Sequence, residues 1–168
     1  NVFSFFTIYA NIDGFSAPGG RGAGWRDPSL RSELDRWITS ELHRTIRDVR
    51  ESMDGFENYP SAQRLNDFVD ALSNWYVRRS RDRFWQADRD VDKWDAYNTL
   101  YESLVALSRL IAPFTPFFAE LMHQHLCRPQ AFASDAPGTK LSVHLCDYPE
   151  ANDALIDEAL AAEMDLVR

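Results

Sequence analysis

Residues 72–85, LSNWYVRRSRDRFW, begin as the apolar face of an amphipathic helix and end in a cluster of arginines. Apolar residues lead into this stretch in steps of three and four, which is the spacing of one helix face: Leu65, Phe68, Leu72, Trp75 and Tyr76. The same steps place Arg79 and Arg83 next on that face and take Phe84 off it. Because a helix face that packs on a core normally stays apolar, the pattern predicts a helix that extends beyond its own bundle and presents guanidinium groups there.

The segment before this helix predicts another long helix that packs against it. Asp27 is followed by Pro28, a typical N-cap and first helical residue, and Gly55 is placed to end the helix. Between them, apolar side chains recur at helical spacing: Leu30, Leu34, Trp37, Ile38, Leu42, Ile46, Val49 and Met53. The arginine-bearing helix is then predicted to begin near residues 59–61.

Two further helices are predicted after the arginine cluster. Asp90 or Asp92 can cap the first of them, whose apolar face is Tyr97, Leu100, Tyr101, Leu104, Leu107 and Ile111. Residues 112–116, APFTP, break this helix because two prolines do not both fit a helix interior. Thr115 can cap the next helix, which carries Phe118, Leu121, Met122 and His125.

These patterns predict an all-α fold, an antiparallel helix bundle with one small β excursion. The alternation of residues 141–145, LSVHL, predicts a short strand. We expect four regions: a connecting helix and glycine-rich loop at 1–27, the helix bundle at 28–127, a loop with the short strand at 128–150, and the start of a truncated acidic C-terminal helix at 151–168.

Glycines cluster in the first region at Gly19, Gly20, Gly22 and Gly24. A loop that cradles phosphate needs a strand before the glycines and a helix directly after them, and neither is predicted here. A flexible surface connection is therefore the favoured interpretation.

Length and composition favour one packed domain, because the chain has 168 residues of which 45% are hydrophobic. It has no run of about 18 apolar residues, so no membrane-spanning helix is expected. The first residues, NVFSFFTIYANIDGF, lack an initiator Met, a basic region and a cleavage site, so we expect the interior of a longer chain rather than a signal peptide. Two cysteines, Cys127 and Cys146, favour a reducing, cytoplasmic setting, although a single bridge between them is compatible with the sequence.

The net charge of −8 is distributed unevenly along the chain. Residues 147–168 have seven acidic residues against Arg168 and so account for −6 of this charge. In contrast, residues 75–87 carry a local charge of +3, from four arginines against Asp82. A negative total therefore does not exclude a nucleic acid as a partner.

Each clustered arginine needs a carboxylate, an aromatic face or a phosphate as its partner. Salt bridges within the chain are one interpretation, because acidic residues are abundant. The other is an anion-binding surface in which neighbouring aromatic rings add stacking faces, a combination suited to single-stranded or looped RNA. The rings in question are Trp75, Tyr76, Phe84 and Trp85.

The run SNWYVRRSRDRFW at residues 73–85 closely resembles the anticodon-binding domain of isoleucyl-tRNA synthetases, which are class I aminoacyl-tRNA synthetases. Other stretches resemble the same family in the same order: NVFSFF and YAN within residues 1–11, LDRWI at 34–38, APFTPFFAE at 112–120, and SVHL with YP within 142–149. Valyl and leucyl enzymes share a looser form of the pattern and are the alternatives. The glycines of residues 19–24 depart from the family pattern.

The resemblance implies that the chain binds the anticodon stem and loop of an isoleucine-accepting tRNA. The implied tRNA-binding residues are Trp75, Tyr76, Arg78, Arg79, Arg81, Arg83 and Trp85. It also implies a parent enzyme whose catalytic domain uses ATP and Mg²⁺ to attach isoleucine to that tRNA during protein biosynthesis. The family's His-Ile-Gly-His and Lys-Met-Ser-Lys-Ser signatures are absent, so we expect no cofactor and no ligase activity in this chain alone. Four arginines supply few phosphate contacts, so weak tRNA binding is expected.

Two other groups of residues were considered as a metal site and as catalytic carboxylates, and neither has the spacing that such a site needs. A zinc site would draw on His123, His125, Cys127, His144 and Cys146, but their spacing lacks a C-x-x-C pair, so no metal is expected. Several carboxylates scatter around helix faces without a histidine in catalytic geometry, which favours surface roles: Glu33, Glu41, Asp48, Asp67 and Asp70.

Arg44, Arg47 and Arg50 form either a second basic track or local ion pairs with Glu51 and other surface acids. A helical protein-interaction module that docks an acidic partner is the alternative function from another class.

Overall fold

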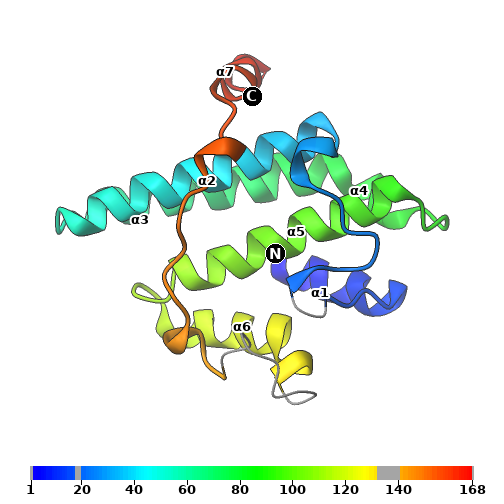
Figure 1. Cartoon of the computed structure of the whole chain (residues 1–168), viewed down its shortest axis with the longest axis horizontal. Coiled ribbons are helices and arrows are strands. Elements are labelled where there is room, and N and C mark those ends of the chain that lie inside the picture. Colours follow the sequence, from blue (N-terminus) through cyan, green and yellow to red (C-terminus); the bar gives the residue numbers. More distant parts are fainter. Residues whose placement is uncertain (1, 18–19, 132–140, 168) are drawn as a thin grey trace.

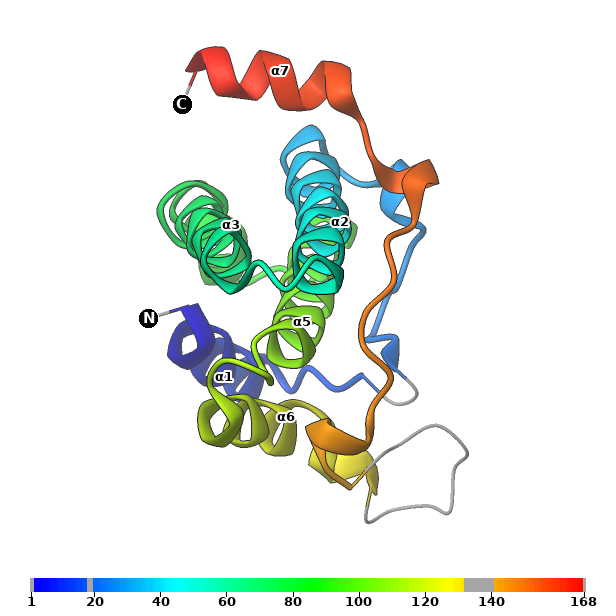
Figure 2. The same ribbon diagram turned by 90° about the vertical axis from the view of Figure 1, so that its left-hand side faces the viewer.

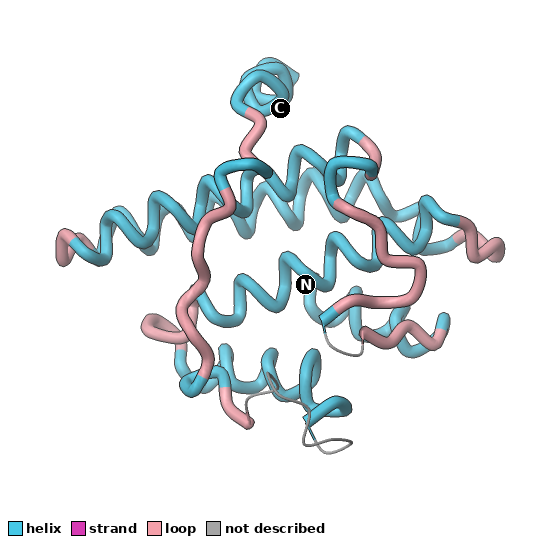
Figure 3. Tube along the Cα trace, viewed as in Figure 1, coloured by secondary structure: helices cyan, strands magenta, loops and turns pink. Residues whose placement is uncertain are grey.

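The computed structural model describes residues 2–17, 20–131 and 141–167, and within these ranges it contains helices and loops but no strand (Figures 1 and 3). The α-helices are α1 (Val2–Asp13), α2 (Glu33–Asp54), α3 (Asn58–Asp70), α4 (Arg78–Trp85), α5 (Val91–Leu110), α6 (Pro116–Ala131) and α7 (Glu158–Val167). None of these helices has the length and apolar character that a membrane span requires. The predicted all-α fold is confirmed.

Helix α2 begins later than the Asp27-Pro28 pair predicted. Asp27 instead caps a separate 3₁₀ turn, Pro28–Leu30, by accepting a hydrogen bond from the Ser29 amide at 3.0 Å. The N-cap of α2 is Ser32, whose hydroxyl accepts from the amide of Asp35 at 3.3 Å. In both caps a side-chain oxygen accepts a hydrogen bond from a backbone amide. The Asp27-Pro28 pair therefore does start a helical element, but that element is the short 3₁₀ turn and not α2.

Helices α3 and α4 form one continuous rod that runs antiparallel to α2 (Figures 1 and 2). They are joined through Ala71–Val77, a π-helical segment in which each turn holds more residues than a regular α-helix. The rod covers the span predicted for the arginine-bearing helix, and Gly55 ends α2 before it, as expected. The widened segment was not predicted.

Helix α5 is the central element of the bundle and begins at the predicted cap Asp90, which accepts from the Lys93 amide at 2.8 Å. In Figure 2 it lies between the pair α2 and α3 on one side and the pair α1 and α6 on the other. The largest fully buried side chains come mainly from α2, α5 and the α3–α4 rod: Trp37, Phe68, Leu72, Tyr76, Phe84, Tyr97, Leu100 and Leu104.

Helix α6 begins after the predicted break, but its buried face differs from the prediction. The buried residues are Ala119, Met122, His123, Leu126 and Cys127, whereas Phe118, Leu121 and His125 are exposed. Because α6 carries apolar residues on more than one face, periodicity alone could not choose the side that packs. The side chain of Thr115, which was predicted to cap α6, donates its hydroxyl to the Ile111 carbonyl of the preceding turn at 3.4 Å.

The short strand predicted at residues 141–145 is wrong. Val143–Leu145 form a 3₁₀ turn whose cap is Ser142. The carboxylate of Glu120 on α6 accepts from the Ser142 hydroxyl and the Val143 amide, both at 2.9 Å. These groups are therefore satisfied by a side chain and not by a neighbouring strand. Residues 132–140 of the predicted loop lie outside the described residues.

The described part of the glycine-rich loop is anchored on α5, which the prediction of a flexible connection missed. The Gly22 amide donates to the Asn98 side chain at 2.8 Å, and a Cβ atom at Gly22 would overlap the Phe15 ring. Trp25 then donates to Glu102 at 2.6 Å. Gly22 is thus required by close packing, while Gly19 lies outside the described residues.

Candidate nucleic-acid interface

The π-helical segment rotates the arginine-bearing helix relative to the predicted phase. It accommodates one extra residue, so the fully buried positions after it become Ser80 and Phe84. Arg79 turns outward, and Arg83 stays largely buried beside them. Phe84 is only 2% exposed, and its ring centroid lies 4.8 Å from that of Tyr97. The predictions that Phe84 leaves the apolar face and that the helix runs past its bundle are therefore wrong.

Three of the four arginines face solvent. Arg78, Arg79 and Arg81 are exposed, and within the described part of the chain none of them forms an ion pair with a carboxylate. The guanidinium carbon of Arg79 lies 4.5 Å from the centroid of the Trp75 ring. This turn of α4 consequently presents positive charge that no carboxylate of the described residues neutralises.

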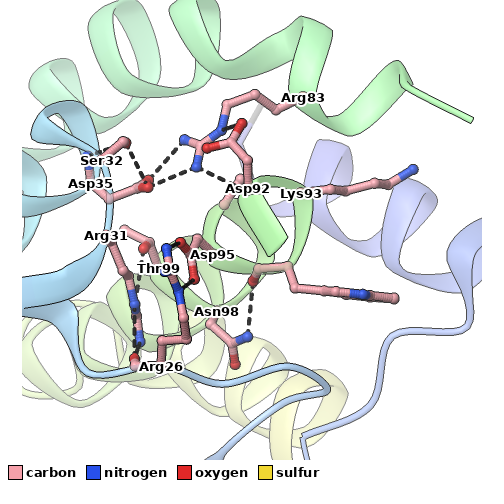
Figure 4. A network of polar contacts seen from close by, with 12 residues as sticks. Arg26, Arg31, Ser32, Asp35, Arg83, Asp92, Lys93, Asp95, Asn98 and Thr99 are labelled. Carbon is pink, nitrogen blue, oxygen red and sulfur yellow. Dashed lines mark hydrogen bonds and ion pairs between the residues drawn. The ribbon is translucent and has the colours of Figure 1, made fainter. Parts of the chain in front are cut away.

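Arg83 has the opposite environment and follows the salt-bridge interpretation (Figure 4). It donates to both carboxylate oxygens of Asp35 on α2, at 2.9 and 2.7 Å, and to the Asp92 carboxylate at 2.8 Å. Asp35 is completely buried, whereas the Asp92 side chain is about half exposed. One guanidinium therefore ties α4 to the first turns of both α2 and α5.

Tyr76 belongs to the same buried network and offers no surface to a ligand. Its ring is completely buried, and its hydroxyl donates to Asp35 at 2.6 Å. Burial, followed by the charge of Asp35, raises the pKa of Tyr76 well above its ordinary value. The phenol therefore stays protonated and remains the donor in this hydrogen bond.

The charge of Asp35 is maintained by its partners. Burial alone would raise the pKa of Asp35, but the hydrogen bonds and charge of Arg83, aided by Tyr76 and Ser32, lower it below 3.8. Ser32 donates its hydroxyl to the second carboxylate oxygen at 2.7 Å. The buried carboxylate is thus ionised and fully hydrogen-bonded, as a buried charge must be.

Trp85 is the last residue of α4 and lies at the surface. It is 56% exposed, and its indole N–H donates to the Tyr9 hydroxyl on α1 at 2.7 Å. The neighbouring Phe84 ring contacts Phe5 of α1 edge to face, with centroids 5.2 Å apart. Helix α1 therefore sets the orientation of the last turn of α4.

The arginines predicted as a second basic track on α2 have partners within the chain and are not free. Arg44 pairs with Glu41 at 2.5 Å, and both Arg44 and Arg47 approach Glu158 at 3.4 Å. Arg50 donates to the Pro149 carbonyl at 3.0 Å. The partners come largely from the acidic C-terminal region and not from the adjacent Glu51 that the helical spacing suggested.

Two of the five carboxylates considered from the sequence have structural roles, and the other three, Glu33, Asp67 and Asp70, are exposed. Glu41 and Asp48 both bind Arg64 on α3, at 3.3 and 2.9 Å, so they join α2 to α3 and do not form a catalytic pair. Among the described residues, no group of three or more His, Cys, Asp or Glu side chains is placed to hold a metal ion. Burial raises the pKa of the Cys127 thiol.

Sequence reasoning missed Asp35 and the buried Lys93, which are the main anchors around the interface. Lys93 pairs with Asp13 of α1 at 2.8 Å and donates to the Gln86 carbonyl at 2.6 Å. The Ser32-x-x-Asp35 spacing signals a helix start, but nothing local indicates that the same carboxylate receives Arg83. A sequence distance of 48 residues separates these two partners.

Comparisons of the sequence with known proteins match it to one family. Residues 35–168 match the model of the anticodon-binding domain of tRNA ligase. The chain is 50% identical over 167 residues to an isoleucine–tRNA ligase of Dehalococcoides mccartyi and 46% identical over 168 residues to one of Thermus thermophilus. It is 42% identical over 167 residues to isoleucine–tRNA ligase 2 of Bacillus anthracis. These alignments cover 99% of the chain but only 16%, 15% and 14% of the respective relatives.

Proposed function

The chain belongs to the family of anticodon-binding domains of tRNA ligases, and on that premise we propose that it is the tRNA-binding domain of an isoleucine–tRNA ligase. The names of the relatives favour isoleucine over valine or leucine, because the three relatives named above are isoleucine–tRNA ligases. The ligand would be the anticodon stem and loop of the tRNA.

The observation that carries this proposal is the exposed turn of α4. Arg78, Arg79 and Arg81 have no carboxylate partner within the described residues, and phosphates are the anions that such guanidinium groups bind best. Trp75 and Trp85 supply partly exposed aromatic faces beside them. We propose that these five residues contact tRNA.

Tyr76 and Arg83 have a different role in this proposal. Both are engaged with Asp35 in the interior, so they hold the contact surface in place without touching RNA. The tRNA-binding set that the family resemblance implied is thereby divided into contact residues and positioning residues.

We further propose that a longer parent protein attaches isoleucine to this tRNA, using ATP and Mg²⁺ held by a separate catalytic domain. The relatives are named as ligases and are about six to seven times as long as this chain. Translation would place the parent in the cytoplasm. The nucleotide-binding signatures of the family are missing from this sequence, so the chain alone should not support isoleucine-dependent exchange between ATP and pyrophosphate. Measurable exchange by the purified chain would contradict this assignment.

Binding of tRNA at low ionic strength tests the proposed contact surface. We expect the isoleucine tRNA to bind more tightly than duplex DNA of equal charge, with a dissociation constant weaker than about 1 μM, because few phosphates are contacted. Replacing Arg78, Arg79 and Arg81 together by Ala should abolish the preference.

The matched control replaces Arg44, Arg47 and Arg50 by Ala, which removes the same charge from a surface whose arginines already have partners. If this control weakens binding as much as the α4 variant does, general electrostatics and not the α4 surface explains the affinity. If an acidic peptide binds and tRNA does not, the alternative of a protein-interaction module is favoured.

A further inference from the structure

The pair formed by Arg79 and Trp75 is a stacked unit at the surface. The two residues are four apart across the junction between the π-helical segment and α4, and the guanidinium carbon lies 4.5 Å from the indole centroid. Arg79 is exposed and Trp75 is half-buried. One face of the guanidinium is therefore covered by the ring, and the other faces solvent.

A second guanidinium–indole stack, formed by Arg21 and Trp25, has a structural role and serves as a comparison. Arg21 lies 3.9 Å from the Trp25 centroid, but the Trp25 indole donates to Glu102 at 2.6 Å. The buried Arg31 pairs with the same Glu102 at 2.7 Å. The ring of that stack is thus held by an ion-pair network on α5, although Arg21 itself, like Arg79, is exposed and pairs with no carboxylate among the described residues. The Trp75 ring has no such polar anchor in the described part of the chain and is held by packing against the core.

We propose that the Arg79–Trp75 stack is a platform for one unpaired nucleobase, with Arg78 and Arg81 binding the adjacent phosphates. The inference rests on the proposed RNA-binding function and assigns separate parts of a nucleotide to separate side chains. A guanidinium is planar and stacks on a base, and the indole below it holds that plane in one orientation. Arg78 and Arg81, three residues apart, lie on a neighbouring face of the helix where the sugar-phosphate backbone would pass.

Substitution by lysine separates stacking from charge. Arg79→Lys keeps the positive charge but loses the planar group, and Arg47→Lys is the matched control at an exposed position outside the proposed contact surface. We expect Arg79→Lys to weaken binding of a short single-stranded oligoribonucleotide about tenfold, the scale of one base-stacking interaction. Arg47→Lys should change it less than about twofold, because Arg47 lies outside the proposed contact surface.

An abasic oligomer of equal length provides the second arm, because it retains the phosphates and lacks the bases. On this ligand the two lysine variants should bind equally. In the ¹⁵N spectrum, the indole resonance of Trp75 should shift on addition of the intact oligomer and not of the abasic one. The resonance of the buried Trp37 should stay in place with both.

Each result decides between the two proposals. Equal weakening of intact and abasic binding by Arg79→Lys would make Arg79 a phosphate ligand and overturn the platform, while RNA binding would stand. Equal affinity of the Arg79→Lys and Arg47→Lys variants for the intact oligomer would also overturn it. If no resonance of the wild-type protein responds to any RNA at low ionic strength, the proposed function itself fails.

Discussion

The guanidinium of Arg83 and the carboxylate of Asp35 form a two-pronged ion pair between α4 and α2, with nitrogen–oxygen distances of 2.9 and 2.7 Å. The carboxylate lies at the first turn of α2 and is completely buried. Its other hydrogen bonds come from Tyr76 and Ser32. This pair connects the helix that carries the exposed arginines to the centre of the bundle (Figure 4).

Removal of the buried partner should destabilise the fold far more than removal of the exposed one. Asp35→Ala leaves the Arg83 charge without its main partner in the interior, so we expect a loss of about 3–5 kcal/mol in the free energy of unfolding. Asp92→Ala removes a half-exposed partner of the same arginine and should cost less than about 1 kcal/mol. Urea denaturation of both variants measures the difference, and similar losses would show that burial is not the deciding factor.

The carboxylate of Asp35 should make the free energy of unfolding depend on pH under acidic conditions. The pKa of Asp35 is lower in the folded protein than its ordinary value of 3.8, since Arg83 outweighs the effect of burial. Its contribution is therefore complete above the unfolded pKa and is lost as the pH falls through the lower, folded pKa. The stability difference between wild type and Asp35→Asn should be constant near neutral pH and shrink below a pH of about 4. A difference that grew on acidification would contradict the sign.

The rotated phase of α4 predicts unequal effects at two adjacent aromatic residues. Phe84→Ala empties a core position and should cost about 3–5 kcal/mol. Trp85→Ala removes a mostly exposed ring and one hydrogen bond to Tyr9, so about 1 kcal/mol or less is expected. The regular α-helical phase predicted from the sequence would instead take Phe84 off the apolar face, and Phe84→Ala would then cost about as little as Trp85→Ala. Thermal unfolding of the two variants therefore tests the π-helical segment.

Salt dependence should report how many exposed arginines bind phosphate. Replacing Arg78, Arg79 or Arg81 singly by Ala should reduce the slope of log affinity against log salt concentration by about 0.7–0.9 for each phosphate that the variant no longer binds. The unfolding free energy should change by less than about 0.5 kcal/mol, because these side chains are exposed. An unchanged slope in all three variants would show that α4 does not meet the RNA backbone.

Gly22 should not tolerate a side chain, although it lies in a surface segment. A Cβ atom would overlap the Phe15 ring, which stacks on Tyr97, and would lie 2.7 Å from the Asn98 oxygen. We expect Gly22→Ala to cost about 1–3 kcal/mol through overpacking. Gly55→Ala is the control, because φ there is −81° and the nearest atom is 3.4 Å away. Equal stability of the two variants would contradict the anchored loop.

Features that depend on nearby residues could be read from the sequence. Pro116, Gly55 and Asp90 mark helix ends through backbone geometry and capping that involve only neighbouring residues. The apolar face of α5 was likewise predicted, since its spacing follows one regular helix. The strand at residues 141–145 failed because its alternating pattern was outweighed by Glu120, a distant side chain that binds the Ser142 hydroxyl and the Val143 amide.

The sequence by itself determined the all-α class, the order of the helices and the family, because helical periodicity, caps and motif residues are properties of short stretches. Only the tertiary structure decided which arginines are free. Periodicity assumes a uniform helix, whereas packing against α2 and α5 admits an extra residue at Ala71–Val77 and turns Phe84 inward. The pairing of Arg83 with Asp35 joins residues that are far apart in the chain and meet only when the α3–α4 rod packs against α2.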